Sequence, residues 1–199
     1  MDKLRAFIKG KRIALRKYLE SGKLVKQITI LITLLTMGVV ILLAWVIRPD
    51  PRITDAATEL ALTANNIRMF YQTKPGYWGL NTDMVIKNNL QASSMLVDGK
   101  LKNAFGKPVI IGQDTNGSII MPGTRHFTIT FPDLTAKECT AMAAFRLNER
   151  ESLSLLQMVI ITGDKTYEFN WGGTNPLPIT KTEAAKYCGQ QNTIGWSFE

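Results

Sequence analysis

The sequence has few of the residues from which metal and enzyme sites are built. Its 199 residues include one histidine and two widely separated cysteines, Cys139 and Cys188. Neither a multi-histidine metal site nor the short cysteine spacing of structural zinc is therefore available. The sequence also lacks a glycine-rich phosphate loop and a G-x-S-x-G nucleophile motif. These absences indicate a protein that is not an enzyme and that needs no metal or other cofactor.

The residues that could serve in catalysis have simpler explanations. His126 begins an alternating segment that is typical of a β-strand, which favours a structural or solvent-facing role. Glu149 and Glu151 flank Arg150 in a polar run that is typical of a solvated surface rather than of an acid/base pair. An exported enzyme is the interpretation that the sequence supports least.

Positive charge is concentrated at the start of the chain. The first 27 residues contain nine of the 24 lysines and arginines and two acidic residues, a net charge of +7, whereas the remaining charges nearly cancel. The overall pI of about 9.6 therefore does not indicate a nucleic-acid-binding surface. The basic segment precedes an apolar run, and it is either a helix on the inner leaflet of a membrane or a disordered tail.

The apolar run, residues 28–47, contains twenty uncharged residues (ITILITLLTMGVVILLAWVI). As a helix it is long enough to cross the hydrocarbon core of a bilayer. It is longer than the apolar region of a secretory signal and is followed by Arg48, so a cleaved signal peptide is not expected. The positive-inside rule predicts a single-pass inner-membrane protein with a cytoplasmic N-terminus and a periplasmic C-terminal part.

These features divide the chain into three parts. Residues 1–22 are a basic cytoplasmic leader, residues 23–51 are a transmembrane helix that ends in a bend at Pro49 and Pro51, and residues 52–199 are one periplasmic or extracellular domain. The bend is expected because proline lacks an amide donor and disfavours helical geometry in the preceding residue. About 150 residues are enough for one domain with its own core.

The exported domain begins with a pattern that predicts a long amphipathic helix. Apolar residues alternate spacings of four and three: Ile53, Ala57, Leu60, Ala64, Ile67 and Tyr71. Polar residues lie elsewhere on the circumference (Arg52, Asp55, Glu59 and Asn66), so we expect a helix with one buried stripe. We expect the stripe to cover a sheet; the alternative is that it packs against copies of the same helix.

The rest of the domain predicts an antiparallel sheet with short helices. Strand-like segments occur at 107–112, 118–121, 126–131, 157–162 and 166–171. A short helix is expected from Asn81 or Thr82 to about Leu90, and capping boxes at Thr135 and Thr180 predict two more. The fold class is therefore α+β: an N-terminal transmembrane helix continues into an amphipathic spine helix packed on an antiparallel β-sheet.

The two cysteines lie in the exported domain, where the environment is oxidising. Cys139 is in the first turn of one predicted helix and Cys188 closes another, so we expect a disulfide between them. The bond stabilises the domain by roughly 4 kcal/mol in the chain-entropy model. Two buried free thiols are the alternative.

Three tryptophans also lie in this domain: Trp78, Trp171 and Trp196. We expect them to be buried in the core, because that is the usual place of large aromatic side chains. The alternative is an exposed recognition surface.

Short segments along the chain carry a family resemblance. They are Asn65-Asn66-Ile67 through Tyr71, Tyr77-Trp78-Gly79-Leu80, Asn103-Ala104-Phe105-Gly106, Phe127-Thr-Ile-Thr130, Leu134-Thr-Ala-Lys-Glu-Cys139 and Tyr187-Cys188-Gly189. Together with the basic leader and the apolar helix, their order and spacing over about residues 23–199 resemble type IV pilins. The resemblance is greatest to the type IVb class, which includes toxin-coregulated and bundle-forming pilins and the thin-pilus pilins of conjugative plasmids.

The resemblance implies a subunit, major or minor, that an assembly machine extracts from the inner membrane and packs helix on helix into a filament. It also implies a prepilin peptidase that cuts after Gly22 and leaves Lys23 as the first residue. The family usually has an apolar first residue and a glutamate at the fifth position. Here the fifth position is Gln27, whose neutral amide cannot provide the charge of a carboxylate.

A second interpretation keeps the leader. The chain is then an uncleaved single-pass protein whose pilin-like periplasmic domain is a fixed component of an envelope, secretion or conjugation machine. Lys23 and Lys26 favour this interpretation, because burying charged groups in an apolar filament core is costly. We prefer the pilus subunit, since minor and initiating pilins most often lack the glutamate.

Overall fold

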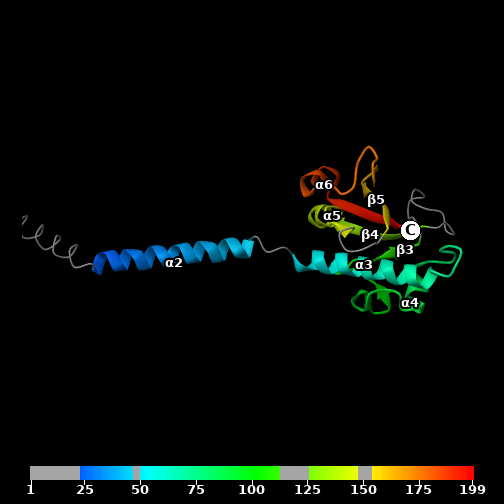
Figure 1. Ribbon diagram of the computed structural model, residues 1–199, viewed down its shortest axis with the longest axis horizontal. Helices are drawn as coiled ribbons and strands as arrows, with labels where there is room; N and C mark the ends of the chain where they lie inside the picture. Colours follow the sequence, from blue (N-terminus) through cyan, green and yellow to red (C-terminus); the bar gives the residue numbers. More distant parts are fainter. Residues whose placement is uncertain (1–22, 47–49, 113–125, 148–153) are drawn as a thin grey trace, which may run out of the picture. The chain divides into compact units, whose positions relative to one another are not determined.

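The computed structural model describes residues 23–46, 50–112, 126–147 and 154–199. They belong to two separate units, Met1–Pro49 and Asp50–Glu199 (Figure 1). Several predicted features lie outside the described residues: the leader 1–22, Pro49, the strand 118–121 and the run from Glu149 to Glu151.

The described part of the first unit is a helix, α2 (Lys23–Val46). Its segment Val25–Leu42 has a mean hydropathy of 2.1, and α2 is the one helix among the described residues that is long and apolar enough to cross a membrane. The hydroxyls of Thr29, Thr33 and Thr36 donate to backbone carbonyls three or four residues earlier, at 2.8–2.9 Å. Because these hydroxyls are satisfied within the helix, they do not need a partner outside it.

The second unit begins with α3 (Pro51–Tyr71), whose start is fixed by local contacts. Asp50 is the N-cap, and its side chain accepts a hydrogen bond from the amide of Arg52 at 3.1 Å. Pro51 occupies the first helical position, where no intrahelical hydrogen bond is lost. The predicted stripe is buried from Ala57 to Tyr71, which confirms that this helix covers the core with one apolar face.

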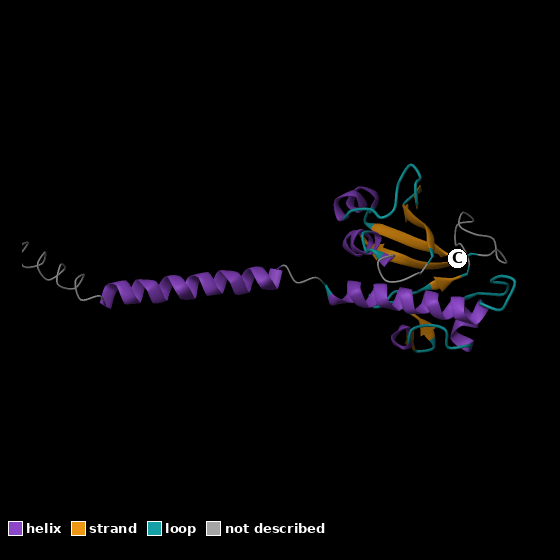
Figure 2. Cartoon of the chain, in the orientation of Figure 1, coloured by secondary structure: helices purple, strands orange, loops and turns teal. Residues whose placement is uncertain are grey.

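A second layer buries another face of α3. It consists of α4 (Thr82–Lys87), η1 (Ser93–Met95) and the hairpin of β1 (Leu96–Val97) and β2 (Lys100–Leu101) (Figure 2). Thr63 of α3 accepts a hydrogen bond from the amide of Ala92 at 3.1 Å and donates one to the sulfur of Met95 at 3.2 Å. Glu59 is also buried, at 5% exposure. Glu59 lies off the apolar stripe, as expected, but the prediction that α3 buries a single stripe is wrong.

Two predicted elements are shorter than expected. The helix predicted to reach about Leu90 ends at Lys87, because Asn89 adopts φ 52°. The amides of Asn89 and Leu90 then bond to carbonyls of the last turn at 3.1 and 3.0 Å, an arrangement that ends helices. The strand β3 contains only Ile110–Ile111 of the predicted 107–112.

The described strands of the main sheet have the order β3-β4-β7-β5-β6, and every neighbouring pair is antiparallel. Their bounds are β3 (Ile110–Ile111), β4 (Phe127–Thr135), β5 (Leu155–Thr162), β6 (Lys165–Asn170) and β7 (Gln191–Phe198). The strands predicted at 126–131, 157–162 and 166–171 are confirmed as β4, β5 and β6, except that His126 and Trp171 lie just outside them. No strand was predicted for β7, although it lies in the centre of the sheet.

One face of this sheet forms the core. β7 places Ile194, Trp196 and Phe198 opposite apolar residues of β4, and all of these side chains are buried. The ring of Tyr77 bridges α3 and the sheet, with centroids 5.2 Å from Tyr71 and 4.7 Å from Phe127. The long helix and the central strands are thus joined by a continuous set of aromatic contacts.

Two further helices, α5 (Ala136–Ala143) and α6 (Lys181–Tyr187), begin with the predicted capping boxes. The amide of Thr135 donates to Glu138 at 2.9 Å, and the amide of Thr180 donates to Glu183 at 2.8 Å. Each glutamate carboxylate thereby satisfies an N-terminal amide of its helix. Both helix predictions are confirmed.

Candidate assembly surface

The helix α2 exposes apolar side chains on all sides. Leu31, Leu35 and Leu42 are each 67–68% exposed, and none of the segment Val25–Leu42 is buried. Removing one leucine side chain from water is worth about 1.5–3 kcal/mol. A helix that is apolar all round is therefore stable in lipid or against other apolar helices, rather than in water.

Polar residues lie at the start of α2. Lys23 is its first residue, and the side chains of Lys26 and Gln27 in the following turn are exposed. The predicted cleavage residue, Gly22, lies outside the described part of the chain. The amide of Gln27 both donates and accepts hydrogen bonds, but it offers no charge to a neighbouring amine.

The start of α3 carries an ion pair next to the predicted bend at Pro49 and Pro51. Arg52 Nη2 lies 2.8 Å from Asp50 Oδ2, and Arg52 Nε lies 3.1 Å from Asp50 Oδ1. These hydrogen bonds hold the pKa of the Asp50 carboxyl below its usual range. The guanidinium of Arg52 also lies 6.0 Å from the ring of Phe105. The first turn of α3 is therefore fixed by side chains on both sides of Pro51.

A disulfide joins α5 to the end of α6. Cys139 in α5 and Cys188 at the end of α6 have Cα atoms 5.9 Å apart, and neither is a free thiol. Cys139 is fully buried. The disulfide predicted from these two cysteines is present, and it attaches a surface helix to the core.

The helix α6 is held on the sheet by few residues. Its buried residue is Ala184, and Tyr187 lies partly buried, with its ring 4.9 Å from Tyr167 and 5.1 Å from Phe169 of β6. Because so little of α6 is buried, the disulfide is an important part of its attachment.

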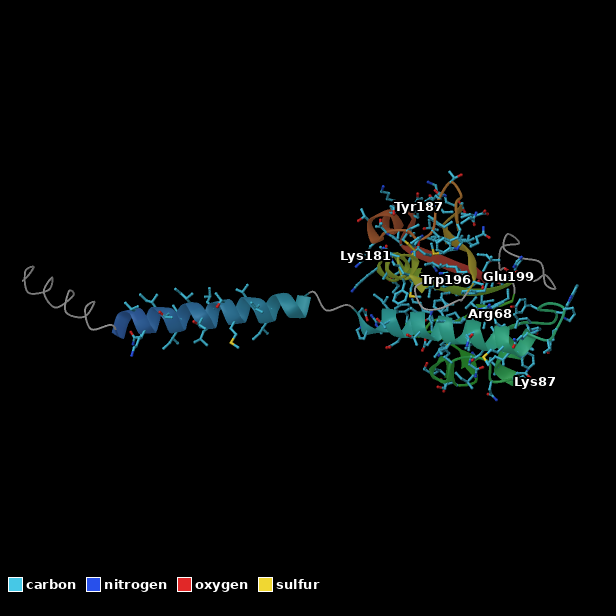
Figure 3. The ribbon with its side chains drawn as sticks, viewed as in Figure 1. Arg68, Lys87, Lys181, Tyr187, Trp196 and Glu199 are labelled. Carbon is cyan, nitrogen blue, oxygen red and sulfur yellow. A yellow bond between two sulfur atoms is a disulfide. The ribbon has the colours of Figure 1, made fainter. Side chains whose placement is uncertain are left out.

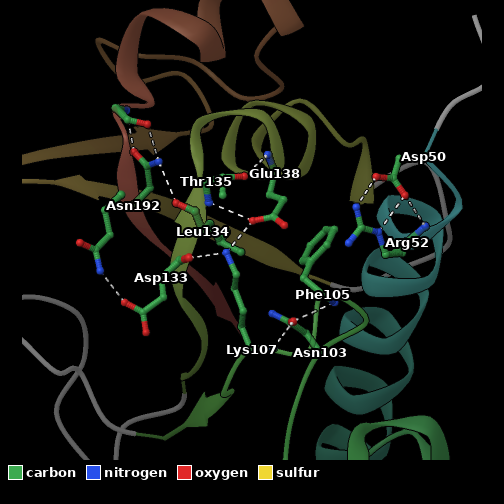
Figure 4. Close-up of polar contacts among 12 residues, drawn as sticks. Asp50, Arg52, Asn103, Phe105, Lys107, Asp133, Leu134, Thr135, Glu138 and Asn192 are labelled. Carbon is green, nitrogen blue, oxygen red and sulfur yellow. Dashed lines mark hydrogen bonds and ion pairs between the residues drawn. The ribbon is translucent and has the colours of Figure 1, made fainter. Parts of the chain in front are cut away.

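A charged contact supports the start of α5 (Figure 4). The ammonium group of Lys107 lies 2.7 Å from Glu138 Oε2 and also donates to the backbone carbonyl of Asp133. Burial raises the pKa of the Glu138 carboxyl, but hydrogen bonds from Lys107 and Thr135 outweigh this effect and hold its pKa below the usual range. The pair joins the segment before β3 to the junction of β4 and α5.

A buried asparagine joins the disulfide region to the sheet (Figure 4). Asn192 donates to the carbonyls of Leu134 and Gly189 at 3.1 and 2.9 Å and accepts from the amide of Gly189 at 2.7 Å. It lies where the β4–β7 register shifts, between Phe131 and Leu134. These contacts hold the chain that follows Cys188 against the irregular part of β4.

The tryptophans divide into one buried and two exposed side chains. Trp196 is 1% exposed, as predicted, but Trp78 and Trp171 are 66% and 45% exposed, so the expectation that all three are buried is wrong. The indole of Trp171 donates to the carbonyl of Leu155 at 2.7 Å, which fixes its orientation beside an apolar cavity of about 250 Å³. Exposed, oriented tryptophans are common in contact surfaces.

Two glutamates of the domain have structural partners. Glu138 pairs with Lys107, and Glu183 caps α6. Within the described residues, no group of three His, Cys, Asp or Glu side chains could hold a metal ion.

The comparisons with known proteins agree with this arrangement. The sequence model of the family described as Bundlin matches residues 50–196. Among solved structures, the chain is similar to TcpA, a type IV pilin from Vibrio cholerae El Tor biotype, with 15% identity and a TM-score of 0.50. That match covers 75% of this chain and 100% of the TcpA chain. It shows the fold: an apolar N-terminal helix, a long helix and an antiparallel sheet.

The chain is also similar to a type IVb pilin from Salmonella typhi, with 17% identity and a TM-score of 0.47; the match covers 71% of this chain and 95% of that one. No curated relative matches the sequence.

Proposed function

Because the chain belongs to the Bundlin family of type IVb pilins, which are structural and non-enzymatic, we propose that it is a subunit of a type IVb or conjugative thin pilus. The observation that carries the proposal is the family match over residues 50–196, which extends across almost the whole second unit. The exposed apolar surface of α2 supports it, because that surface needs a partner.

The helix α2 has two successive environments in this proposal. Before assembly it anchors the subunit in the inner membrane, with the basic leader in the cytoplasm and the domain in the periplasm. After extraction by the assembly machinery, its apolar side chains pack against α2 of other pilin subunits on the cell surface. Such a contact repeats head to tail without closing, which generates a helical polymer.

Processing prepares the subunit for this packing. A prepilin peptidase cuts after Gly22, and Lys23 becomes the first residue of the mature chain. Gln27 occupies the fifth position of the mature chain. There its side-chain oxygen accepts a hydrogen bond from the terminal amine of a neighbouring subunit, but the neutral amide provides no opposite charge. Because the neutral amide and the two lysines weaken packing in an apolar core, a minor or initiating subunit is the best fit.

The bend at Pro49 and Pro51 has a role during extraction. The two helices are separate elements, since α2 ends at Val46 and α3 starts at Pro51 with its own N-cap. We infer that the connection between them lets α2 change direction as it leaves the membrane, while the contacts of Asp50 and Arg52 keep the first turn of α3 intact.

The second candidate is an uncleaved inner-membrane protein whose pilin-like domain is a fixed component of an envelope, secretion or conjugation machine. The observation that favours it is the charge of Lys23 and Lys26 at the start of α2. Lysines at the end of a membrane helix extend to the lipid headgroups at little cost, whereas burial inside a filament is costly.

Filament composition tests the proposal. Pili sheared from cells are purified, and the chain is quantified in them and in the inner membrane. A pilus subunit is present in the filaments, at low stoichiometry if it is minor, and a Gln27→Glu variant, which restores the charge, is incorporated at least as well. If the filaments lack the chain while the inner membrane retains all of it, the second candidate is correct.

A further inference from the structure

A mostly apolar cavity of about 250 Å³ lies in the second unit beside Trp171. Four segments that are separated in the sequence form its walls: the chain after α5, the start of β5, the chain after β6 and the chain before α6. None of its described lining residues is acidic, and the one charged residue among them is Arg146. The other lining residues are apolar: Phe145, Leu147, Leu155, Trp171, Leu177 and Pro178.

The cavity has buried and exposed walls. Leu147 and Leu155 are 3% and 8% exposed and belong to the core of the domain. Trp171 and Pro178 are exposed to solvent. A small molecule can therefore enter from the solvent and contact side chains of the core while the domain stays folded.

Hydrogen bonds hold these walls in place. The indole Nε1 of Trp171 donates to the carbonyl of Leu155 at 2.7 Å, which fixes the orientation of the ring. The segment that follows Trp171 is tied back to the end of β6. There the carbonyl of Asn170 accepts a hydrogen bond from the amide of Leu177 at 3.2 Å, and the amide of Asn170 donates one to the carbonyl of Asn175 at 3.1 Å. A ligand meets a cavity that is already formed, so binding does not have to order its walls.

The lining favours an apolar ring over a polar molecule. The indole N–H of Trp171 is already paired with Leu155, so this side chain offers a ligand its apolar surface. A polar group placed among the apolar side chains loses its hydrogen bonds to water without replacing them, which costs free energy. The volume is also suitable: an apolar cavity of about 150 Å³ is enough to bind benzene. Aromatic ligands gain further contacts with the rings of Trp171 and Phe145.

We propose that this cavity binds a small, uncharged aromatic molecule of one ring or two fused rings. The ligand packs against Trp171 and Phe145, and it contacts Leu155 in the core. Arg146 already has an interaction of its own, and its charge has no role in the proposal. The site gives the exported domain an affinity for aromatic compounds around it. This binding does not depend on cleavage of the leader or on filament assembly.

Fluorine NMR of the full chain in micelles of an uncharged detergent tests the site. The four tryptophans are labelled as fluorotryptophan, and replacing each in turn with phenylalanine assigns its resonance. Indole is the probe, and uracil, a planar ring with polar groups that the lining does not pair, is the comparison. We expect indole to shift the Trp171 resonance saturably and uracil to bind at least tenfold more weakly. Because indole also enters micelles, the shift is judged against that of Trp78, which is exposed in the same unit and should not move.

A substitution in the wall sharpens the test. Leu177→Gln should weaken indole binding about tenfold, because it places an unpaired polar group in the cavity. The matched control is Leu62→Gln, since Leu62 is exposed on α3 and does not line the cavity; it should leave the titration unchanged. Trp196 is buried in the core (Figure 3), so an unchanged Trp196 resonance verifies that both variants are folded.

Three results with indole would overturn the proposal: no saturable shift of Trp171, an equal response to uracil, or equal effects of the two variants. A Trp171 resonance that moves with protein concentration but not with indole would also overturn it, because a second copy of the chain would then occupy the cavity.

Discussion

The two long helices have similar lengths but are stabilised in different ways. α2 has 24 residues and α3 has 21. None of the segment Val25–Leu42 of α2 is buried, and its threonines bond to their own backbone. In contrast, α3 is buried against both the sheet and the second layer, and its Thr63 bonds to other segments. Tertiary packing therefore holds α3, whereas α2 depends on surroundings that are apolar.

This difference predicts that the two units respond separately to mutation. Changes in the core of the second unit should reduce its stability without releasing the chain from membranes. Changes on α2 should affect membrane insertion and assembly without unfolding the domain. A change in one unit that altered the property assigned to the other unit would contradict this separation.

The largest expected effect comes from removing the disulfide. Replacing Cys139 and Cys188 with serine should reduce the free energy of unfolding by about 4 kcal/mol, because the unfolded chain regains the freedom of a long loop. Chemical denaturation in detergent, followed by tryptophan fluorescence, measures this loss, and membrane fractionation should be unchanged. If both single serine variants accumulate and refold like the parent, the disulfide has no structural role.

A core substitution in α3 should have an effect of similar size. Leu60 is fully buried, so Leu60→Ala should reduce the free energy of unfolding by about 2–5 kcal/mol through lost burial and a cavity. The matched control is Leu62→Ala on the same helix, because Leu62 is 50% exposed and its loss should cost within about 0.5 kcal/mol. Similar denaturation midpoints for the two variants would show that α3 is not packed as described.

The corresponding change in α2 should leave domain stability unaltered. Leu35→Lys places a charge near the middle of the apolar segment and should disfavour insertion by about 3 kcal/mol. The chain should shift toward the soluble or degraded fraction, while the same change at exposed Leu62 of α3 should not move it. Unchanged membrane association of the Leu35→Lys variant would contradict a lipid-facing α2.

The smallest expected effect is a pH dependence from Glu59. Burial raises the pKa of its carboxyl, and hydrogen bonds from Ser94 and the amide of Ala104 offset this effect only in part. A raised folded-state pKa means that the contribution to stability is complete below the unfolded pKa of about 4.3 and is lost as pH rises through the folded value. Glu59→Gln should therefore abolish this decline.

Unfolding free energies of parent and Glu59→Gln across pH 4 to 8 measure this effect. The parent should lose stability relative to the variant as pH rises through that range. Parallel curves for the two proteins would show that Glu59 does not titrate differently in the folded domain.

Much of the fold follows from local signals in the sequence. The apolar stripe of α3 and both capping boxes depend on spacing within one helix, so the sequence alone predicts them. The burial of Glu59 does not follow from such a pattern, because it results from a second layer formed by segments 23 or more residues further along the chain. How much of a helix surface is buried depends on tertiary contacts, and the spacing of its apolar residues does not predict those contacts.

The central strand β7 was not predicted from the sequence, for a different reason. Its apolar residues Ile194, Trp196 and Phe198 alternate, which is the usual signal, but Gly195 lies among them and glycine is depleted in strands. The hairpin of β1 and β2 has a recognisable turn in Asp98-Gly99, where both residues have positive φ, but its strands are only two residues long. Short or glycine-containing strands are therefore identified by their neighbours rather than by their own sequence.

The candidate assembly residues stay predictions. The resemblance to pilins points to Gly22, Lys23 and Gln27, but neither processing nor packing is a property of the isolated chain. The exposure of Trp78 and Trp171 has no sequence signal, since aromatic residues occur in cores and on surfaces alike. Contacts between subunits depend on surfaces that only the folded domain defines.

The central claim is that this chain is a processed pilus subunit, and the most direct test is its N-terminus. Intact mass and N-terminal sequence are measured on protein purified from membranes of a host that has a prepilin peptidase. Our account predicts a chain that begins at Lys23 and lacks the first 22 residues. A chain that retains residues 1–22 would contradict it and would favour a permanently anchored pilin-like domain.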